Sequence, residues 1–506
     1  MKQRWPSLAG LGGGSAVAGL ISGPWGALVA GLALLGLPLF AVLGGAAELA
    51  WLSHGSPLNR LAPKVMEEQF AGSPVLVTIP LFTFLGYLLA ESKAPDRIVA
   101  AARALLGWMP GGLALVCLGA SAFFTTLTGG SGVTIVAIGG LLLPTLRKQG
   151  YSERFSLGLV TTGGSLGLLF PPSLPILVYG LVAGLDFMAA FRAGILPGVL
   201  VMVVLGAYAV FTGRREKIAL EPFDLGKLGR ALWAVKWEAL LPVLLLGALA
   251  TSVAGLDEVA ALGALYTLVV ALFVHKDLKW ADLPRIIKSS MALAGAVILI
   301  LLMANALMNF VIDQQLPGKL LESLAALGLH ERWQFLLALN LFLLVVGMVM
   351  DGFSAIIVAV PLVLPFAARF GLQPFHLAMM FILNLELAFS APPLGLNLFI
   401  ASFRFQRPVA SLYRSVLPFV ALLTVSLVVV MAVPWLSTKL IEPDIAEARA
   451  QAEKLKLPPR EAWLLECVQE DVTHPHPCTA AEREKWEPKD AGSDDDDALL
   501  KEMMGQ

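Results

Sequence analysis

One pattern of helix breaks occurs twice in this chain, each time inside long apolar sequence. The pattern is a proline, five residues, a glycine, twenty residues and a proline pair; it runs from Pro144 to Pro171-Pro172 and again from Pro365 to Pro392-Pro393. A glycine costs about 1 kcal/mol and a proline about 3 kcal/mol in a helix interior, so both proline pairs are expected to break helices. Identical spacing in the two halves predicts an internal duplication with a broken membrane helix in each copy.

Each copy has another break upstream of its proline pair. The motifs GGSG, at 129–132, and DGFS, at 351–354, stand at corresponding places. The arms beside GGSG are about 15 residues long, whereas a helix needs about 20 residues to cross the roughly 30 Å hydrocarbon layer. We therefore predict a re-entrant helical hairpin in each copy, with arms at 113–128 and 133–147 in the first and at 333–350 and 355–368 in the second.

The composition indicates that these breaks lie in a membrane. Of the 506 residues, 57% are hydrophobic and 14% are charged, and the mean hydropathy is +0.77. Too little polar surface remains to cover a soluble globule of this size. The predicted fold class is an all-α polytopic membrane protein with two inverted-topology repeats, surrounded by the lipid bilayer and without a nucleic-acid partner.

The sequence divides into membrane regions and an acidic tail. The tail has 17 Asp and Glu against 9 Lys and Arg, which is typical of a separate soluble piece. Residues 7–24 are rich in glycine, and three interpretations stay open for them: a span, an interfacial segment or a leftover signal. The expected regions are N-terminal membrane segments with a connector at 1–72, the first repeat at 73–217, middle scaffold helices at 218–289, the second repeat at 290–436 and the tail at 437–506.

Basic turns predict which side of the membrane each connection faces. Positive charge favours the cytoplasmic side, and the basic turns are 147–154, 214–217, 275–288 and 404–407. The link at 368–376, after the second hairpin, has one arginine and is expected outside, opposite to its counterpart in the first copy. This opposition predicts inverted repeats and a periplasmic tail. Small and apolar residues at helical spacing, together with Arg97 and Arg103, predict an interfacial amphipathic helix between the first crossings and the first hairpin.

Helix breaks at membrane depth leave carbonyl and hydroxyl oxygens that can coordinate a hard cation such as sodium. The candidate ion-binding residues are Gly130, Ser131, Thr134, Pro171 and Ser173 in the first copy and Asp351, Ser354, Ser390 and Pro392 in the second. The candidate substrate-binding residues are Thr128, Ser131, Ser173, Asp351, Asn384, Glu386 and Asn397. A single Gly-Ser turn is more often a packing feature or a kink, but its duplication at fixed spacing favours a binding site.

Two acidic residues fall inside apolar segments, where an unpaired charge costs at least about 2.5–3.5 kcal/mol. Asp351, at the second tip, is expected to contact a cation or substrate, or else to cap the helix that starts there. For Glu386, an ion site, a proton site and a hydrogen-bond partner for a neighbouring helix remain open. Asn384 and Asn397 can line a cavity or hold helices together.

The sequence does not favour an enzyme. GGSG fits the Gly-x-Ser-Gly pattern of intramembrane serine proteases, but that chemistry needs a histidine base at membrane depth. All six histidines fall at predicted segment ends or in the tail. The sequence contains no P-loop lysine motif, so ATP is not expected to drive this chain directly, and no cofactor is expected beyond coupling ions.

The cysteines carry one further expectation. Cys117 lies in the first hairpin arm and is interpreted as a small apolar residue. Cys467 and Cys478 stand in the tail as CVQEDVTHPHPC. In an oxidising periplasm they can form a disulfide; a metal site that also uses His474 and His476 is the alternative.

Several quoted segments resemble the large membrane subunit, DctM, of tripartite ATP-independent periplasmic (TRAP) transporters. The similarity covers roughly 26–436. The segments are GGSGVTIVAIGGLLLPTLRKQGY, GLLFPPSLPILVYG, GMVMDGFSAIIVAVPLVLP, APPLGLNLFIAS, IPLFTFLGYLLAES and ALLGWMPGGLALV. The resemblance implies a sodium-driven secondary transporter of the bacterial inner membrane with an elevator mechanism. It also implies two partners, a periplasmic substrate-binding protein and a small, DctQ-like membrane subunit.

The resemblance implies an organic solute, mostly organic acids in this family, without identifying it. Two departures bear on the ion count or substrate class: GGSGV has less serine and alanine than the family often carries, and Glu386 stands where the family has a small residue. The rival functions are a sodium/anion symporter that needs no binding protein and, from another class, a channel or membrane scaffold.

Overall fold

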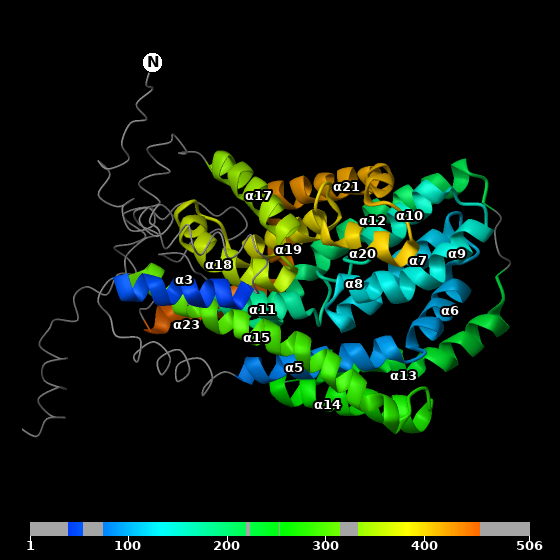
Figure 1. The fold of residues 1–506 in the computed structure, drawn as a ribbon, viewed down its shortest axis with the longest axis horizontal. Helices are drawn as coiled ribbons and strands as arrows, with labels where there is room; N and C mark the ends of the chain where they lie inside the picture. Colours follow the sequence, from blue (N-terminus) through cyan, green and yellow to red (C-terminus); the bar gives the residue numbers. More distant parts are fainter. Residues whose placement is uncertain (1–38, 54–73, 219–222, 252, 314–331, 456–506) are drawn as a thin grey trace, which may run out of the picture.

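The computed structural model describes residues 39–53, 74–218, 223–251, 253–313 and 332–455 (Figure 1). All regular structure in these ranges is helical, which confirms the all-α prediction. Six helices of the described part are long and apolar enough to cross a membrane, or seven if one bent pair counts as a span. Residues 7–24 and both tail cysteines lie outside the described residues.

Residues 73–217, the predicted first repeat, contain nine helical elements. They are α5 (Pro74–Glu91), α6 (Ala94–Leu106), α7 (Gly112–Thr128), α8 (Ser131–Thr134), the π-helix η3 (Ile135–Gly139), α9 (Gly140–Lys148), α10 (Glu153–Gly163), α11 (Leu174–Ala183) and α12 (Phe187–Arg215). The bent pair is α5 and α6, which meet at 71°.

Helix α3 (Leu39–Ser53) precedes α5 in the chain, and the predicted middle section and second repeat follow α12. The middle elements are α13 (Leu225–Ala250), α14 (Leu256–Val269), the π-helix η4 (Val270–Val274), η5 (Trp280–Asp282) and α15 (Leu283–Asp313). The later elements are α17 (Arg332–Val349), α18 (Gly352–Arg369), α19 (Pro374–Ser390), α20 (Leu396–Phe405), α21 (Val409–Ala432), α22 (Trp435–Thr438), η6 (Lys439–Ile441) and α23 (Glu442–Leu455).

The predicted breaks are present. At the first tip, Gly129 adopts φ 65°, a left-handed conformation that suits glycine, and its N–H donates to Thr125 O, which ends α7. At the second tip, α17 ends at Val349 and α18 begins at Gly352. Both proline pairs lie between helices and contain cis peptide bonds.

Three element boundaries differ from expectation. The apolar sequence at 155–168 predicts one helix up to the first proline pair, but α10 ends at Gly163 and the chain continues in tight turns, such as Ser165 N to Thr162 O at 3.4 Å. The basic residues Lys227, Arg230 and Lys236 predict an interfacial stretch before a crossing at about 238–254, but α13 begins at Leu225 and continues through this stretch into the crossing. Helix α17, expected as a hairpin arm, is 18 residues long and passes as a span by length and hydropathy.

Three of the basic turns gather at one end of the molecule. Glu153 forms ion pairs with Arg147 at 3.2 Å and with Arg407 at 2.6 Å. The N–H of Ser152 donates to Glu216 Oε2 at 3.0 Å, just beyond the C-terminal end of α12. These contacts join the turns that follow α9, α12 and α20, and Figure 1 shows α9 and α6 together at the right.

The link after the second hairpin lies at the other end. His376, at the start of α19, pairs through Nδ1 with Ser437 Oγ at 3.2 Å, and Arg192, near the start of α12, forms a 2.7 Å ion pair with Asp444 of α23. Since α12 has 29 residues, its ends are roughly 43 Å apart at about 1.5 Å per residue. The links that follow the two hairpins therefore lie at opposite ends of α12. Buried Ile441 and Ile445 show that the first part of the expected tail packs onto the helical body.

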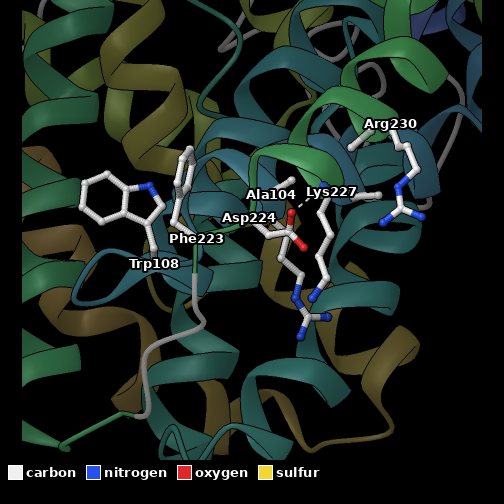
Figure 2. Close-up of a pocket in the computed structure, with 9 residues that line it drawn as sticks. Ala104, Trp108, Phe223, Asp224, Lys227 and Arg230 are labelled. Atoms are coloured by element: carbon white, nitrogen blue, oxygen red, sulfur yellow. Dashed lines mark hydrogen bonds between the residues drawn. The ribbon is translucent and has the colours of Figure 1, made fainter.

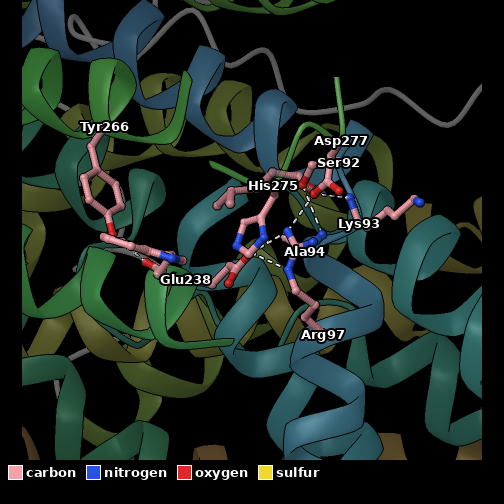
Figure 3. Close-up of polar contacts among 10 residues, drawn as sticks. Ser92, Lys93, Ala94, Arg97, Glu238, Tyr266, His275 and Asp277 are labelled. Carbon is pink, nitrogen blue, oxygen red and sulfur yellow. Dashed lines mark hydrogen bonds and ion pairs between the residues drawn. The ribbon is translucent and has the colours of Figure 1, made fainter. Parts of the chain in front are cut away.

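A buried ion network attaches the amphipathic helix α6 to the middle helices (Figure 3). Arg97 donates through Nε to Glu238 Oε1 of α13 at 2.7 Å and through Nη2 to Asp277 Oδ2, beyond η4, at 2.7 Å. The side chains of Glu238 and Asp277 are only 2% and 5% exposed. Burial raises the pKa of Asp277, but the hydrogen bonds and charge of Arg97 outweigh it and hold that pKa below its ordinary value. Two buried carboxylates thus share one guanidinium, and Asp277 Oδ2 also accepts a hydrogen bond from Lys93 N–H at 3.2 Å.

Candidate functional site

The first tip and the first break form a cluster of oxygen atoms. Thr125, in the last turn of α7, lies 2.6 Å from the hydroxyl of Thr134 on α8 and donates to Gly164 O at 2.8 Å. The next residue, Thr126, donates through Oγ1 to Gly167 O at 3.1 Å and to Ala122 O at 2.8 Å. Thr125 and Thr134 are buried. Hydroxyl and carbonyl oxygens at a helix break are the ligands that transporters offer to sodium.

Glycines allow the break to approach the tip this closely. A Cβ on Gly164 would lie 2.4 Å from Ile135 Cγ1 and 2.9 Å from Ser131 O. A Cβ on Gly167 would lie 2.3 Å from Ala122 O and 2.4 Å from Thr126 N, both backbone atoms of α7. Any larger residue would therefore separate the carbonyls of the break from the threonines of α7.

Several predicted residues of the first copy line the same region. Ser131 is buried at the start of α8, and its carbonyl approaches Gly164. Thr128 and Ser173 are buried, and their hydroxyls have no hydrogen-bond partner within the described ranges. The N–H of Thr134 lies 3.4 Å from Gly130 O. Pro171 lies in the turn before α11. The structure thus groups Gly130, Ser131 and Thr134 around the tip.

Asp351 caps a helix at the second tip. Its Oδ2 accepts hydrogen bonds from the N–H groups of Phe353 at 3.1 Å and Ser354 at 3.2 Å, and its Oδ1 contacts the Ser354 hydroxyl. These bonds satisfy free N–H groups at the start of α18. The capping role left open by the sequence is therefore present, and it occupies both carboxylate oxygens and the hydroxyl of Ser354.

The second break holds a different polar set. Ser390, the last residue of α19, accepts a hydrogen bond from Asn397 Nδ2 of α20 at 3.4 Å, across the turn that contains Pro392. Asn397 Oδ1 is buried without a partner among the described atoms. Ser390 and Asn397 thus meet at the predicted second break, where the side-chain amide of Asn397 lies beside the hydroxyl of Ser390.

Glu386 is fully buried, one helical turn before Ser390, on a helix whose every residue is buried. Neither carboxylate oxygen has a hydrogen-bond partner in the described part of the chain. An isolated carboxylate at such a place is strongly disfavoured, so it must carry a proton or meet a cation. Of the three roles left open, a hydrogen bond to a neighbouring helix is therefore absent in these ranges.

Asn384 connects two helices. Its Nδ2 donates to Asn340 O at 3.0 Å and to Asn340 Oδ1 at 2.9 Å, which joins α19 to α17. It lies two residues from Glu386 and so faces nearly the opposite way on the helix. The helix-joining alternative describes Asn384 better than a cavity-lining one.

At each break, the half-helix that follows packs against the hairpin of the other copy. Helix α11, after the first break, packs along α18 of the second hairpin, and α20, after the second break, packs along α8 and η3 of the first hairpin. At the tip, Gly129 lies against Leu174 of α11 and Gly132 lies against Ile400 of α20. The first tip therefore contacts the half-helices that follow both breaks.

Sequence reasoning missed four residues of this site: Thr125, Thr126, Gly164 and Gly167. A signal was present, since Thr-Thr pairs occur at 125–126 before the tip and at 161–162 before the turn, each close to a Gly-Gly pair. The described ranges contain no group of three or more His, Cys, Asp and Glu that could hold a metal ion. A cation here would be held by hydroxyl and carbonyl oxygens.

The sequence matches a known protein family. A family model described as "Tripartite ATP-independent periplasmic transporter, DctM component" matches residues 27–436. The C4-dicarboxylate TRAP transporter large permease protein DctM of Vibrio cholerae is 31% identical over 81% of this chain and 95% of its own length. The ectoine/5-hydroxyectoine large permease protein UehC of Ruegeria pomeroyi is 30% identical over 78% of this chain and 92% of its own.

Two further comparisons concern a longer relative and a solved structure. The isethionate TRAP transporter permease protein DctMQ of Oleidesulfovibrio alaskensis is 31% identical over 79% of this chain, which covers 63% of that longer protein. The crystal structure of the YdaH transporter of Alcanivorax borkumensis is similar with a TM-score of 0.57 at 16% identity, over 81% of this chain and 97% of that one. This likeness concerns the fold alone.

Proposed function

Because the chain belongs to the DctM family of large TRAP transporter permease components, we propose that it imports a small organic acid by sodium-coupled transport. Permeases of this family move small organic solutes, and the chain is not an enzyme. The observation that supports sodium is the oxygen cluster of Thr125, Thr134 and Gly164 at the first tip. Such a cluster suits a small hard cation.

The proposed partners are a periplasmic binding protein that delivers the substrate and a small DctQ-like membrane subunit. The TRAP family name and the DctMQ relative support both. We further propose that the protein lies in the bacterial inner membrane with its basic end in the cytoplasm and its tail in the periplasm. The ion-paired basic turns at 147–154 and 404–407 support this orientation.

We propose inverted repeats and an elevator movement for the mechanism. The opposite placement of the two hairpin links along α12 supports the inversion. Helices α3, α5, α13, α14 and α15 pack on one another and would form the scaffold, while α7 to α12 and α17 to α21 carry the breaks and would move. Bound solute and ions would then cross together with the helices that hold them.

Transport by reconstituted protein tests the proposal. With both partners in proteoliposomes, uptake is expected to need an inward sodium gradient, and the double variant Thr125→Val/Thr134→Val is expected to lower sodium affinity about tenfold or more, because two cation ligands are lost. Thr145→Val is the matched control, since Thr145 is only partly buried and its hydroxyl bonds only to Leu141 O of its own helix at 3.0 Å.

The outcomes separate the rival functions. Unchanged sodium activation in the double variant would contradict the ion site. Uptake without the binding protein would indicate the independent symporter. Flux without counterflow of preloaded substrate would indicate a channel, because a channel does not exchange.

Glu386 carries a further prediction. Glu386→Gln keeps the shape of the side chain but removes its charge, so the pH profile or the ion requirement of transport is expected to shift. Uptake measured across pH and sodium concentration, per amount of folded protein, reports this shift. Glu442→Gln is the control, since Glu442 is a surface carboxylate paired with Lys439 at 2.9 Å. Transport that matches the parent at every pH and sodium level would make Glu386 purely structural.

A further inference from the structure

A basic groove lies between the amphipathic helix α6 and the first turns of α13, away from both tips (Figure 2). Its volume is about 760 Å³, and it is open to the surroundings. The side chains that give it its character are Arg103, Trp108, Phe223, Asp224, Lys227 and Arg230. The family membership and the transport proposal leave this groove unassigned.

The groove carries an excess of positive charge. Arg103, Lys227 and Arg230 contribute three cations, against one carboxylate, that of Asp224. Asp224 Oδ1 is occupied as the cap of α13, because it accepts from the N–H groups of Gly226 at 2.8 Å and Lys227 at 3.1 Å. These backbone hydrogen bonds, together with the nearby charges of Lys227 and Arg230, hold the pKa of Asp224 below its ordinary value, and one carboxylate balances only one of the three basic side chains. The remaining charge suits an anion.

The surroundings of the groove are apolar, which selects the kind of anion. Trp108 and Phe223 meet edge to face at 6.0 Å on one side, and both are about half exposed. Farther along α13, Trp233 is exposed, with Lys236 Nζ lying 3.2 Å from its ring centroid. Aromatic rings beside basic groups are typical of the membrane interface, and basic pockets between helices on the cytoplasmic side bind lipid headgroups.

We propose that this groove binds the phosphate headgroup of an anionic phospholipid, with the acyl chains along the exposed apolar face of α13. Lys227 and Arg230 would pair with the phosphate oxygens, while Trp108 and Phe223 would lie at the level of the glycerol. The lipid would bridge α6 and α13, the same two helices that the Arg97–Glu238 pair joins deeper in the protein. It would thus reinforce the connection between the middle helices and the first hairpin.

Direct binding tests this proposal without any transport assay. Purified protein in mild detergent is titrated with phosphatidylglycerol and, in parallel, with phosphatidylcholine, and retained lipid is counted by native mass spectrometry. The parent is expected to retain phosphatidylglycerol at least about tenfold more tightly than phosphatidylcholine, and Lys227→Gln/Arg230→Gln is expected to remove this preference. Lys279→Gln/Lys288→Gln is the control, because it removes two exposed lysines from the basic turn at 275–288.

Each other outcome contradicts the proposal in a recognisable way. Equal retention by the parent and the Lys227→Gln/Arg230→Gln variant would show that the groove is not the site. Competition by soluble glycerol phosphate at the same concentration as lipid would indicate a free phosphate ligand instead. If the Lys227→Gln/Arg230→Gln variant instead loses the small membrane subunit during copurification while it retains lipid like the parent, the groove is an interface with that subunit.

Discussion

Replacing Arg97 with alanine is expected to destabilise the folded protein by about 3–5 kcal/mol, because it leaves buried carboxylates without their counter-charge. Arg97 is the guanidinium that pairs with both Glu238 Oε1 and Asp277 Oδ2, and both carboxylate side chains are at most 5% exposed; without it, Asp277 keeps only the neutral hydrogen bond from Lys93 N–H at 3.2 Å. His275 Nε2 lies 3.7 Å from Glu238 Oε1, too far to replace the lost hydrogen bond. Unfolding of the purified variant, followed by tryptophan fluorescence against denaturant, measures the loss.

A second arginine pair provides the comparison. Arg285 of α15 forms a bidentate pair with Glu91 of α5, at 3.0 and 2.8 Å, but the two side chains are 60% and 37% exposed. Exposed pairs contribute about 0–1 kcal/mol, so Arg285→Ala is expected to change stability little. Equal losses in Arg97→Ala and Arg285→Ala would refute the role assigned to burial. In the double variant Arg97→Met/Glu238→Leu, where no charge remains buried at Glu238, part of the stability is expected to return.

Gly167→Ala is expected to lower sodium-dependent uptake about tenfold or more while folded protein still reaches the membrane. The new methyl group would lie 2.3 Å from Ala122 O and 2.4 Å from Thr126 N, and backbone atoms of a helix cannot rotate away. The turn must therefore move, which separates its carbonyls from Thr125 and Thr126. Overpacking of this kind costs about 1–3 kcal/mol, and about 1.4 kcal/mol already corresponds to tenfold in rate.

Gly163→Ala is the matched control in the same stretch. A Cβ there would meet the side chain of Ser121 at 3.6 and 3.8 Å, which is ordinary van der Waals contact. Its uptake is therefore expected to stay near that of the parent. Uptake and the amount of monodisperse protein after gel filtration are measured for both variants. Parent-like uptake in Gly167→Ala would show that the close approach of turn and tip is not needed for transport.

Local backbone chemistry accounts for what could be predicted at the tips and breaks. Glycine and proline act on the residues beside them, so GGSG, DGFS and the two proline pairs indicated where helices stop. The capping alternative for Asp351 was equally local, because an aspartate caps N–H groups two and three residues later. The end of α10 at Gly163 was missed, since a turn held by its contacts with α7 has no comparable local signal.

The sequence could not show which residues contact one another at the candidate site, because local patterns contain no information about residues distant in the chain. Gly164 lies 39 residues from Thr125 in the chain, and Glu238 lies 141 residues from Arg97, yet both pairs are in direct contact. Asn384 and Glu386 are both polar residues in one apolar segment, but a rotation of about 200° separates them on the helix. Asn384 therefore binds Asn340, while Glu386 is buried without a partner among the described residues.

The sequence by itself determined that this is a helical membrane protein with duplicated breaks, because hydropathy, glycine and proline act over a few residues at a time, and its similarity to known permeases assigned it to the DctM family. Only the tertiary structure decided which oxygens meet. Packing brought Thr134 and Gly164 to Thr125 and left Glu386 alone in the core. It also joined α6 to α13 through Arg97 and opened a basic groove beside them. Such contacts depend on how helices pack against one another, because each contact joins two residues that are far apart in the sequence.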